Sequence, residues 1–306
     1  MTPPFYLPEQ VGQLYAPNAA AAVSAGRQAG MKPSSTDRQR TLLLLVDAQV
    51  DFIHTDGALS VPGAVDDTRR TIEWLCRNAG EVTTIAASLD SHVPIQIFFP
   101  TWWVDDAGQH PEPYTTITSH EVDRRRWRPL YEPEWSQEYV ERLEHDSRKE
   151  LMIWPYHVLI GTVGHSFSPA LYEAVAFHTA ARQSQPIFLA KGSIPKTEHY
   201  SILEPEVKVP EAPLGSLNIG FLSMIATYDR IYIAGQAKSH CVLETVASMM
   251  RYFKDRPDTI SKIRVLMDCT SSVAHPEIDF DVMADEALAV YAERGLTLAN
   301  STDELK

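Results

Sequence analysis

The stretch "DRIYIAGQAKSHCVLETVASMMRYF", residues 229–253, changes its pattern at Cys241. Its first part is a short apolar run that ends in turn residues, and such a run is typical of a buried parallel strand. In its second part Val246, Met249 and Phe253 recur at spacings of three and four residues, which predicts a helix with one apolar face. The stretch therefore predicts a strand followed at once by a helix, with a thiol at the junction.

The same alternation continues along the chain. Similar apolar runs occur at 41–47, 82–90, 185–191 and 262–269, with a weaker one at 295–300. Helical patterns lie between them, at 66–79, 169–183, 215–227, 241–254 and 279–294. Strands that alternate with helices favour a parallel sheet covered on both faces. We therefore predict an α/β fold with three α/β/α layers and a central, mostly parallel sheet of the Rossmann-like kind.

Composition narrows the function classes. The chain has 306 residues, a formal net charge of −13 and a pI near 5.3. Acidic proteins are poor binders of nucleic acid or anionic membranes through bulk charge, so we expect neither partner. No apolar run approaches the length of a membrane span, and no secretory signal pattern opens the sequence. Three cysteines are too few for a disulfide framework, which favours a reducing, cytoplasmic location.

Two segments depart from the alternation. Residues 1–40 are rich in Ala, Pro, Gly and Ser, and we interpret them as an N-terminal extension or as an arm on a neighbouring subunit. Residues 41–300 form the predicted α/β domain, with an insertion at about 99–150 that holds four tryptophans. Such an insertion could cover the active-site mouth and form a contact in a homo-oligomer, or its tryptophans could pack as a small core of their own.

Chemically complementary residues end the predicted strands. Asp47, Asp90 and Lys191 close three apolar runs, and a short turn leads from a fourth run to Cys241. Because the carboxyl ends of parallel strands meet at one edge of a sheet, we expect these side chains to lie close together. One such residue alone would be an ordinary polar strand end, but two acids, an amine and a thiol together indicate a reactive site.

Cys241 has two interpretations. A free cysteine is most often a small buried hydrophobe, and we assign that role to Cys76 and Cys269. At the start of a helix, however, unpaired N–H groups and the helix dipole favour a thiolate, and a nearby lysine would lower the thiol pKa further. A carboxylate nearby could take the thiol proton.

A second group has the composition of a metal site. Asp90 and His92 stand at one strand end, and His157 follows the insertion. One carboxylate and two imidazoles suit zinc, manganese or iron, with water completing the coordination. The competing interpretation is a chance pair and a loop histidine.

Five short motifs in order carry a resemblance to a known family. They are "LLLVDAQVDF" (43–52), "DSH" (90–92), "IWPYH" (153–157), "LAKG" (189–192) and "IAGQAKSHCV" (233–242). In this order and context the sequence resembles the nicotinamidases, cysteine hydrolases of the isochorismatase-like superfamily. The resemblance covers roughly residues 41–300, without much of 99–150.

The resemblance implies the following chemistry. Asp47 would be the general base, Lys191 would hold the thiolate, and Cys241 would attack the amide carbon, so that ammonia leaves and water hydrolyses a thioester. The family's cis peptide bond would fall between Gln236 and Ala237. The backbone N–H groups of Ala237 and Cys241 would bind the oxyanion.

The resemblance also implies the substrate and metal sites. Phe52 and Trp154 match aromatics that sandwich the substrate ring, and Tyr200 matches a further pocket residue. Asp90, His92 and His157 would hold one divalent ion, zinc first and manganese or iron otherwise, which binds the pyridine nitrogen in that family. Gln96 and Phe98 stand where some members have a further histidine ligand, so we expect three protein ligands.

We therefore predict an amidohydrolase that releases ammonia from a small amide such as nicotinamide. The first alternative is a related cysteine hydrolase for another amide or carbamoyl substrate, because the long insertion could shape a different pocket. A second alternative is a vinyl-ether hydrolase of the isochorismatase type, but such enzymes lack the nucleophilic cysteine, so Cys241 argues against it. A third is a non-catalytic binding protein on the same scaffold, and the intact Asp-Lys-Cys set argues against it because the fold does not require these three residues.

Overall fold

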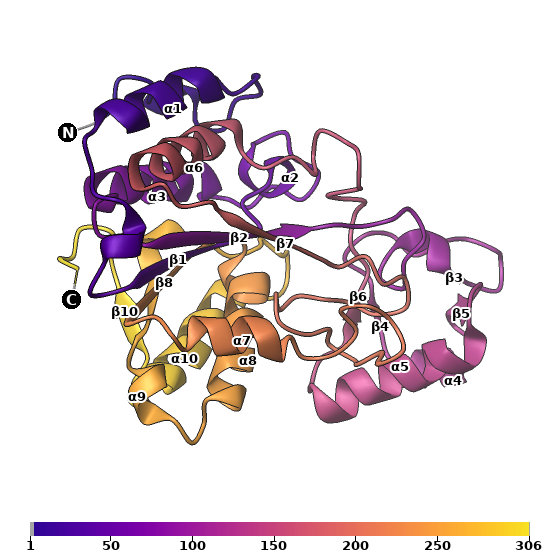
Figure 1. The fold of residues 1–306 in the computed structure, drawn as a ribbon. Coiled ribbons are helices and arrows are strands. Elements are labelled where there is room, and N and C mark those ends of the chain that lie inside the picture. Colours follow the sequence, from indigo (N-terminus) through magenta and orange to yellow (C-terminus); the bar gives the residue numbers. More distant parts are fainter. Residues whose placement is uncertain (1–2, 306) are drawn as a thin grey trace.

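A central sheet of six parallel strands organises the chain, which a computed structural model describes over residues 3–305 (Figure 1). The strand order is β10-β9-β8-β1-β2-β7, and all neighbouring pairs run parallel. The strands are β1 (Thr41–Val46), β2 (Thr84–Asp90), β7 (Ile187–Lys191), β8 (Arg230–Gly235), β9 (Ile263–Leu266) and β10 (Thr297–Ala299). The α/β fold with a parallel sheet is confirmed.

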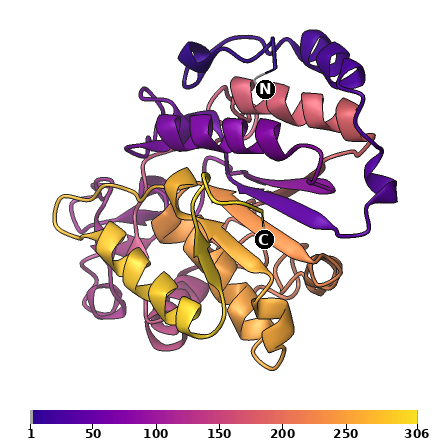
Figure 2. The ribbon, with the colours of Figure 1, turned by 90° about the vertical axis from the view of Figure 1, so that its left-hand side faces the viewer.

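Helices cover both faces of this sheet, as Figure 2 shows from the side. One face carries α3 (Ala64–Asn78) and α6 (Pro169–Arg182), with the short α2 (Val50–Ile53) near the end of β1. The other carries α7 (Ile219–Ile225), α8 (Leu243–Tyr252), α9 (Pro257–Ile260) and α10 (Phe280–Glu293). Helix α7 is shorter than the predicted 215–227, because the Asn218 side chain accepts a hydrogen bond from Phe221 N and starts the helix there.

The central strand β1 is buried on both sides. Leu43 and Leu45 pack with α3 and α6 in one hydrophobic cluster, whereas Leu42 and Leu44 pack with α7 and α8 in another. A strand in the middle of a doubly covered sheet needs apolar side chains on both faces, which explains the unbroken leucine run. The edge strand β7 differs from that expectation, since Phe188 is 39% exposed there.

The N-terminal segment lies on its own chain. Helix α1 (Ala19–Gln28) packs against α6, and a side chain at Gly26 would collide with the backbone of Phe177. The Arg182 guanidinium pairs with Asp37 where the segment approaches the sheet. These contacts order the segment within one subunit; an additional reach to a neighbouring subunit stays a prediction from the sequence.

The long excursion between β2 and β7 forms a lobe beside the sheet (Figure 1). Its elements are β3 (Trp103–Val104), β4 (Thr116–Ile117), α4 (Ser119–Asp123), β5 (Arg128–Pro129), α5 (Pro133–Asp146) and β6 (Leu151–Met152). Trp102 and Trp103 are 2% and 0% exposed, and their indole N–H groups donate to Ser136 Oγ and Ile97 O. Trp127 is also buried, and Trp135 donates to the backbone of the β7–α7 loop. The tryptophans therefore pack as part of this chain's own core.

Short helical turns complete the chain at Pro8–Gln10, Ser34–Thr36, Pro100–Trp102 and Met267–Cys269, with a π-helical turn at Lys238–Val242. Among residues 3–305, no helix has the length and apolar character of a membrane span. Homo-oligomerisation stays a prediction from the sequence.

Candidate active site

The parallel sheet brings the predicted reactive side chains together at the carboxyl ends of four adjacent strands. Asp47 follows β1 directly, while Asp90 and Lys191 are the last residues of β2 and β7 and are register partners. Cys241 follows β8 after a five-residue turn. All four side chains are buried, so they meet in a site with little access to water.

Lys191 is the centre of this group. Its Nζ lies 2.9 Å from Asp47 Oδ2, 3.0 Å from Asp90 Oδ1 and 3.7 Å from Cys241 Sγ. It also donates a hydrogen bond of 2.9 Å to the carbonyl oxygen of His199. One ammonium group therefore touches the thiol and both carboxylates.

Asp47 is held in a defined orientation by Ser88 on the neighbouring strand. Ser88 Oγ donates to Asp47 Oδ1 at 2.6 Å and accepts from Asp47 N at 3.0 Å. Asp47 has a φ of 43°, which is uncommon for a residue other than glycine. The serine therefore holds one carboxylate oxygen and leaves the other, Oδ2, toward Lys191.

Burial dominates the protonation of the thiol. Burial raises the pKa of Cys241 well above its ordinary value; Lys191 lowers it, but the Asp47 and Asp90 carboxylates raise it again. The expected lowering of the thiol pKa by Lys191 is present, but burial and the two carboxylates outweigh it in the resting site. Burial also raises the pKa of Asp47 although Lys191 opposes this, which makes Asp47 a stronger proton acceptor than an ordinary aspartate.

The lysine keeps its charge. Burial alone would lower the pKa of Lys191, but the Asp47 and Asp90 carboxylates outweigh it and raise that pKa well above the ordinary value. A fixed positive charge beside a neutral thiol can stabilise negative charge that develops on sulfur.

The turn that presents Cys241 has an unusual backbone. The Gln236–Ala237 peptide bond is cis, as the resemblance implied, and Lys238–Val242 forms a π-helical turn before α8 begins at Leu243. The sequence pattern 241–254 suggested that Cys241 is the first residue of the helix. In the structure Cys241 instead lies inside the π-helical turn. Gly235 has a φ of 117°, and a Cβ there would lie 2.1 Å from Val46 O.

A cluster that could hold a metal ion adjoins the thiol. The ligand atoms of Asp90, His92 and His157 all lie within 4.8 Å of one another. His92 Nδ1 bonds to Gly192 O at 3.0 Å and His157 Nδ1 to Pro155 O at 2.7 Å, so each ring has its Nε2 atom left for a ligand. His92 Nε2 is buried and faces the Asp90 carboxylate, 3.1 Å from Oδ2. This donor set fits a divalent metal ion.

Two members of the cluster have the protonation states that metal binding requires, and the third is shifted by its neighbour: burial would lower the pKa of His92, but the Asp90 carboxylate outweighs it and raises that pKa. Burial, together with the neighbouring His92, lowers the pKa of His157 to about 3, so His157 is neutral at physiological pH. Burial would raise the pKa of Asp90, but His92 and Lys191 hold it well below its usual range. Neutral imidazole and carboxylate are the forms that bind metal.

Neighbouring loops position the cluster. The Val158 N–H, next to His157, donates to Asp51 Oδ2 at 2.7 Å, which ties this loop to α2. Gly192 has a φ of 82°, and a Cβ there would lie 2.2 Å from Asp90 Oδ1. Gln96 donates to Gly192 O and Ile194 O, so it fixes the loop that follows Lys191.

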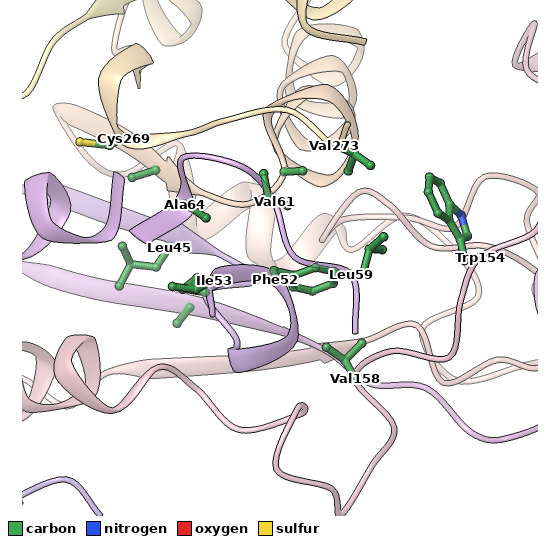
Figure 3. Close-up of a cluster of buried hydrophobic side chains, with 14 of the residues drawn as sticks. Leu45, Phe52, Ile53, Leu59, Val61, Ala64, Trp154, Val158, Cys269 and Val273 are labelled. Atoms are coloured by element: carbon green, nitrogen blue, oxygen red, sulfur yellow. The ribbon is translucent and has the colours of Figure 1, made fainter. Parts of the chain in front are cut away.

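The aromatic residues predicted for the substrate site line a cavity above the thiol. Phe52, Trp154 and Tyr200 face this cavity together with Cys241 and Ala237. Trp154 Nε1 donates to the Tyr200 hydroxyl at 3.0 Å. Figure 3 shows Phe52, Leu59 and Val273 on the side of the core that leads toward Trp154. The cavity has a volume of about 20 Å³, which leaves room for little more than a water molecule.

Four lining residues were not among the site residues predicted from the sequence: Leu59, Glu198, His240 and Val273. Burial raises the pKa of Glu198 to about 7, although His92 opposes this. The only sequence signal for Glu198 is its place two residues before Tyr200 in the loop after Lys191.

Comparisons with known proteins agree on the fold. No protein-family model matches the chain, and no curated protein matches its sequence. Among solved structures, the chain is similar to a yeast nicotinamidase bound to the inhibitor nicotinaldehyde, with 17% identity, a TM-score of 0.57, and coverage of 85% of this chain and 99% of that one.

Two further structures are similar. An Acinetobacter baumanii nicotinamidase and pyrazinamidase has 19% identity, a TM-score of 0.54, and coverage of 88% of this chain and 100% of that one. PnC1 from L. infantum in complex with nicotinate has 17% identity, a TM-score of 0.52, and coverage of 89% of this chain and 96% of that one. The chain therefore shares the fold of these solved structures.

Proposed function

We propose that this chain is an amidohydrolase that releases ammonia from a small amide such as nicotinamide, through a thioester on Cys241. The observation that carries the proposal is the contact of one ammonium, Lys191, with a buried thiol and a buried carboxylate, 3.7 Å and 2.9 Å away, beside an aromatic cavity. A thiol, a proton acceptor and a fixed positive charge are the groups that nucleophilic attack on an amide requires. The nicotinamidase-like fold supports this choice of reaction.

The first half-reaction transfers the acyl group to sulfur. Asp47 takes the thiol proton as Cys241 Sγ forms a bond to the amide carbon, and Lys191 stabilises the charge that develops. The backbone N–H groups of Ala237 and Cys241 are the proposed donors to the oxyanion. Asp47 then gives its proton to the amide nitrogen, the C–N bond breaks, and ammonia leaves.

The second half-reaction releases the acid. Asp47 takes a proton from a water molecule, whose oxygen attacks the thioester carbon. When the C–S bond breaks, Asp47 returns that proton to the Cys241 sulfur, and the carboxylic acid departs. Because one carboxylate serves both halves, the raised pKa of Asp47 suits a group that alternately accepts and donates a proton.

Asp90, His92 and His157 are the proposed ligands of a divalent metal ion, zinc first and manganese or iron otherwise. When bound there, such an ion would supply a Lewis-acid position that orients a heteroatom of the substrate. Phe52, Trp154 and Tyr200 are the proposed contacts for the substrate ring.

An ammonia-release assay tests the proposal. Nicotinamide, pyrazinamide, carbamoyl compounds and small aliphatic amides form the substrate panel, and wild type is expected to turn over at least one amide. Cys241→Ala should abolish release, whereas Cys269→Ala, a change at an equally buried cysteine outside the site, should retain it. An aldehyde analogue of the best substrate should add its mass at Cys241 only.

Turnover by Cys241→Ala at a rate near that of wild type would contradict the nucleophile. Release of ammonia from carbamoyl compounds alone would assign the chain to the related class of carbamoyl hydrolases.

A further inference from the structure

A second cavity lies beside the reaction cavity. It has a volume of about 470 Å³, within the range of small-molecule sites, whereas the reaction cavity has about 20 Å³. Tyr200 and His240 line both cavities, so these two side chains form the partition between them.

The two halves of the partition are held differently. Tyr200 accepts a hydrogen bond from Trp154 Nε1, and the Lys149 ammonium lies 5.5 Å from its ring centre. Lys149 is itself fixed by Glu206 and Glu244, at 2.6 Å and 2.7 Å. Tyr200 is therefore the fixed half.

His240 is the other half. Its ring packs against three aromatic side chains, with centroid distances of 5.2 Å to Trp154, 5.2 Å to Tyr200 and 4.9 Å to Phe280. Its hydrogen bond within the described residues is with the adjacent Ser239 Oγ, at 2.8 Å. Burial lowers the pKa of His240 to about 3, so the ring is neutral and an apolar group can pass it without desolvating a charge.

The larger cavity has an apolar wall. Ile278, Phe280, Met283 and Ala287 line it from α10 and the preceding loop, and Leu243 lines it from α8. Met283 is 57% exposed at this wall, so its side chain is accessible to a ligand. Four charged residues also line the cavity: Lys149 and Glu244 pair with each other, whereas Arg148 and Glu150 are exposed to solvent.

We propose that this second cavity is a subsite for an apolar acyl extension of the substrate, entered past the His240 side chain. The amide group would reach Cys241 in the reaction cavity, while an unbranched chain or second ring would lie against α10. This inference rests on the proposed amidase function, because it assigns the far end of the same substrate.

A chain-length series tests the inference. The probes are unbranched primary amides from acetamide to decanamide, assayed by ammonia release with wild type and two variants of α10. We expect kcat/KM of wild type to rise by about fourfold for each methylene group that becomes buried. Ala287→Trp fills the cavity and should remove this rise while leaving acetamide turnover unchanged. Ala289→Trp, at an exposed position of the same helix that does not line the cavity, should retain the rise.

A binding experiment separates this inference from the proposed reaction. Calorimetry with Cys241→Ala measures the affinity for the same amides, alone and combined with Ala287→Trp. If wild type hydrolyses no amide, a length-dependent affinity that Ala287→Trp removes would still support the subsite. If Ala287→Trp lowers the melting temperature strongly, Ala287→Leu is the milder filler.

Two results would overturn the subsite. One is the absence of any chain-length effect, both on kcat/KM of wild type and on the affinity of Cys241→Ala. The other is an equal loss for acetamide and the long amides in Ala287→Trp, which would make the cavity only an approach path.

Discussion

Replacement of Ser88 by alanine tests whether Asp47 is the base. Ser88 Oγ donates to Asp47 Oδ1 at 2.6 Å and accepts from Asp47 N at 3.0 Å, and both residues are fully buried. Ser88→Ala removes both bonds without adding volume. Both hydrogen bonds of Ser88 Oγ are with Asp47 and neither is with the Cys241 thiol. The substitution should therefore change catalysis through Asp47.

The magnitude follows from the charge on the acceptor. A hydrogen bond to a charged group contributes about 1.5–3 kcal/mol, and each 1.4 kcal/mol corresponds to a factor of ten in rate. We therefore expect kcat/KM to fall by about tenfold to a hundredfold. Loss of a bond to the ionised form also raises the pKa of Asp47. Because the base must be deprotonated, the acidic limb of the pH profile should move to higher pH.

The assay is ammonia release as a function of pH, with circular dichroism and thermal melting as folding controls. Ser88→Thr keeps the hydroxyl and should restore much of the activity. Ser168→Ala is the matched control, because Ser168 is equally buried but its Oγ has no partner among residues 3–305. A folded Ser88→Ala protein with kcat/KM within about threefold of wild type and an unshifted profile would refute the argument that Ser88 supports Asp47 as the base.

Three further outcomes are expected. His157→Ala should lower the metal content of the purified protein, measured by mass spectrometry, and a full complement would contradict the ligand set. Burial lowers the pKa of His178 from 6.5 to about 4, so its protonation in the unfolded chain removes stability as pH falls from about 6.5 to 4. We measure the free energy of unfolding by urea denaturation at pH 7.5 and pH 4.5. The decrease between these two pH values should be smaller for His178→Asn than for wild type, by up to about 3 kcal/mol. Equal decreases in the two proteins would contradict this prediction. Cys76→Ala and Cys269→Ala should retain ammonia release, apart from stability losses, since neither residue lines the reaction cavity; loss of release from a folded variant would implicate a second thiol.

Local patterns were sufficient for the elements of the central sheet. The leucine run of β1 predicts a strand buried on both faces, and the spacing of Val246, Met249 and Phe253 predicts α8, because burial in a covered layer requires these patterns. The same topology rule predicted that Asp47 and Lys191 would meet, since parallel strands end at one edge.

Other predictions failed or were incomplete because they depend on neighbours that are distant in sequence. The thiol pKa of Cys241 is raised, since burial and two carboxylates outweigh the one lysine, and a position at a helix start does not reveal that balance. Trp102 and Trp103 could have lain at an interface, but the lobe folds back so that both indoles are buried. Glu198 reaches the cavity only through the path of the loop after β7.

The sequence by itself determined the α/β alternation and the identity of the reactive groups, because both follow from residue type and spacing along the chain. The tertiary structure decided their orientation and environment: that Ser88 holds Asp47, that Lys191 touches two carboxylates, and that His240 separates two cavities. The physical reason is that orientation, desolvation and cavity shape arise from atoms brought together by packing, and their energies depend on distances that one-dimensional spacing does not contain.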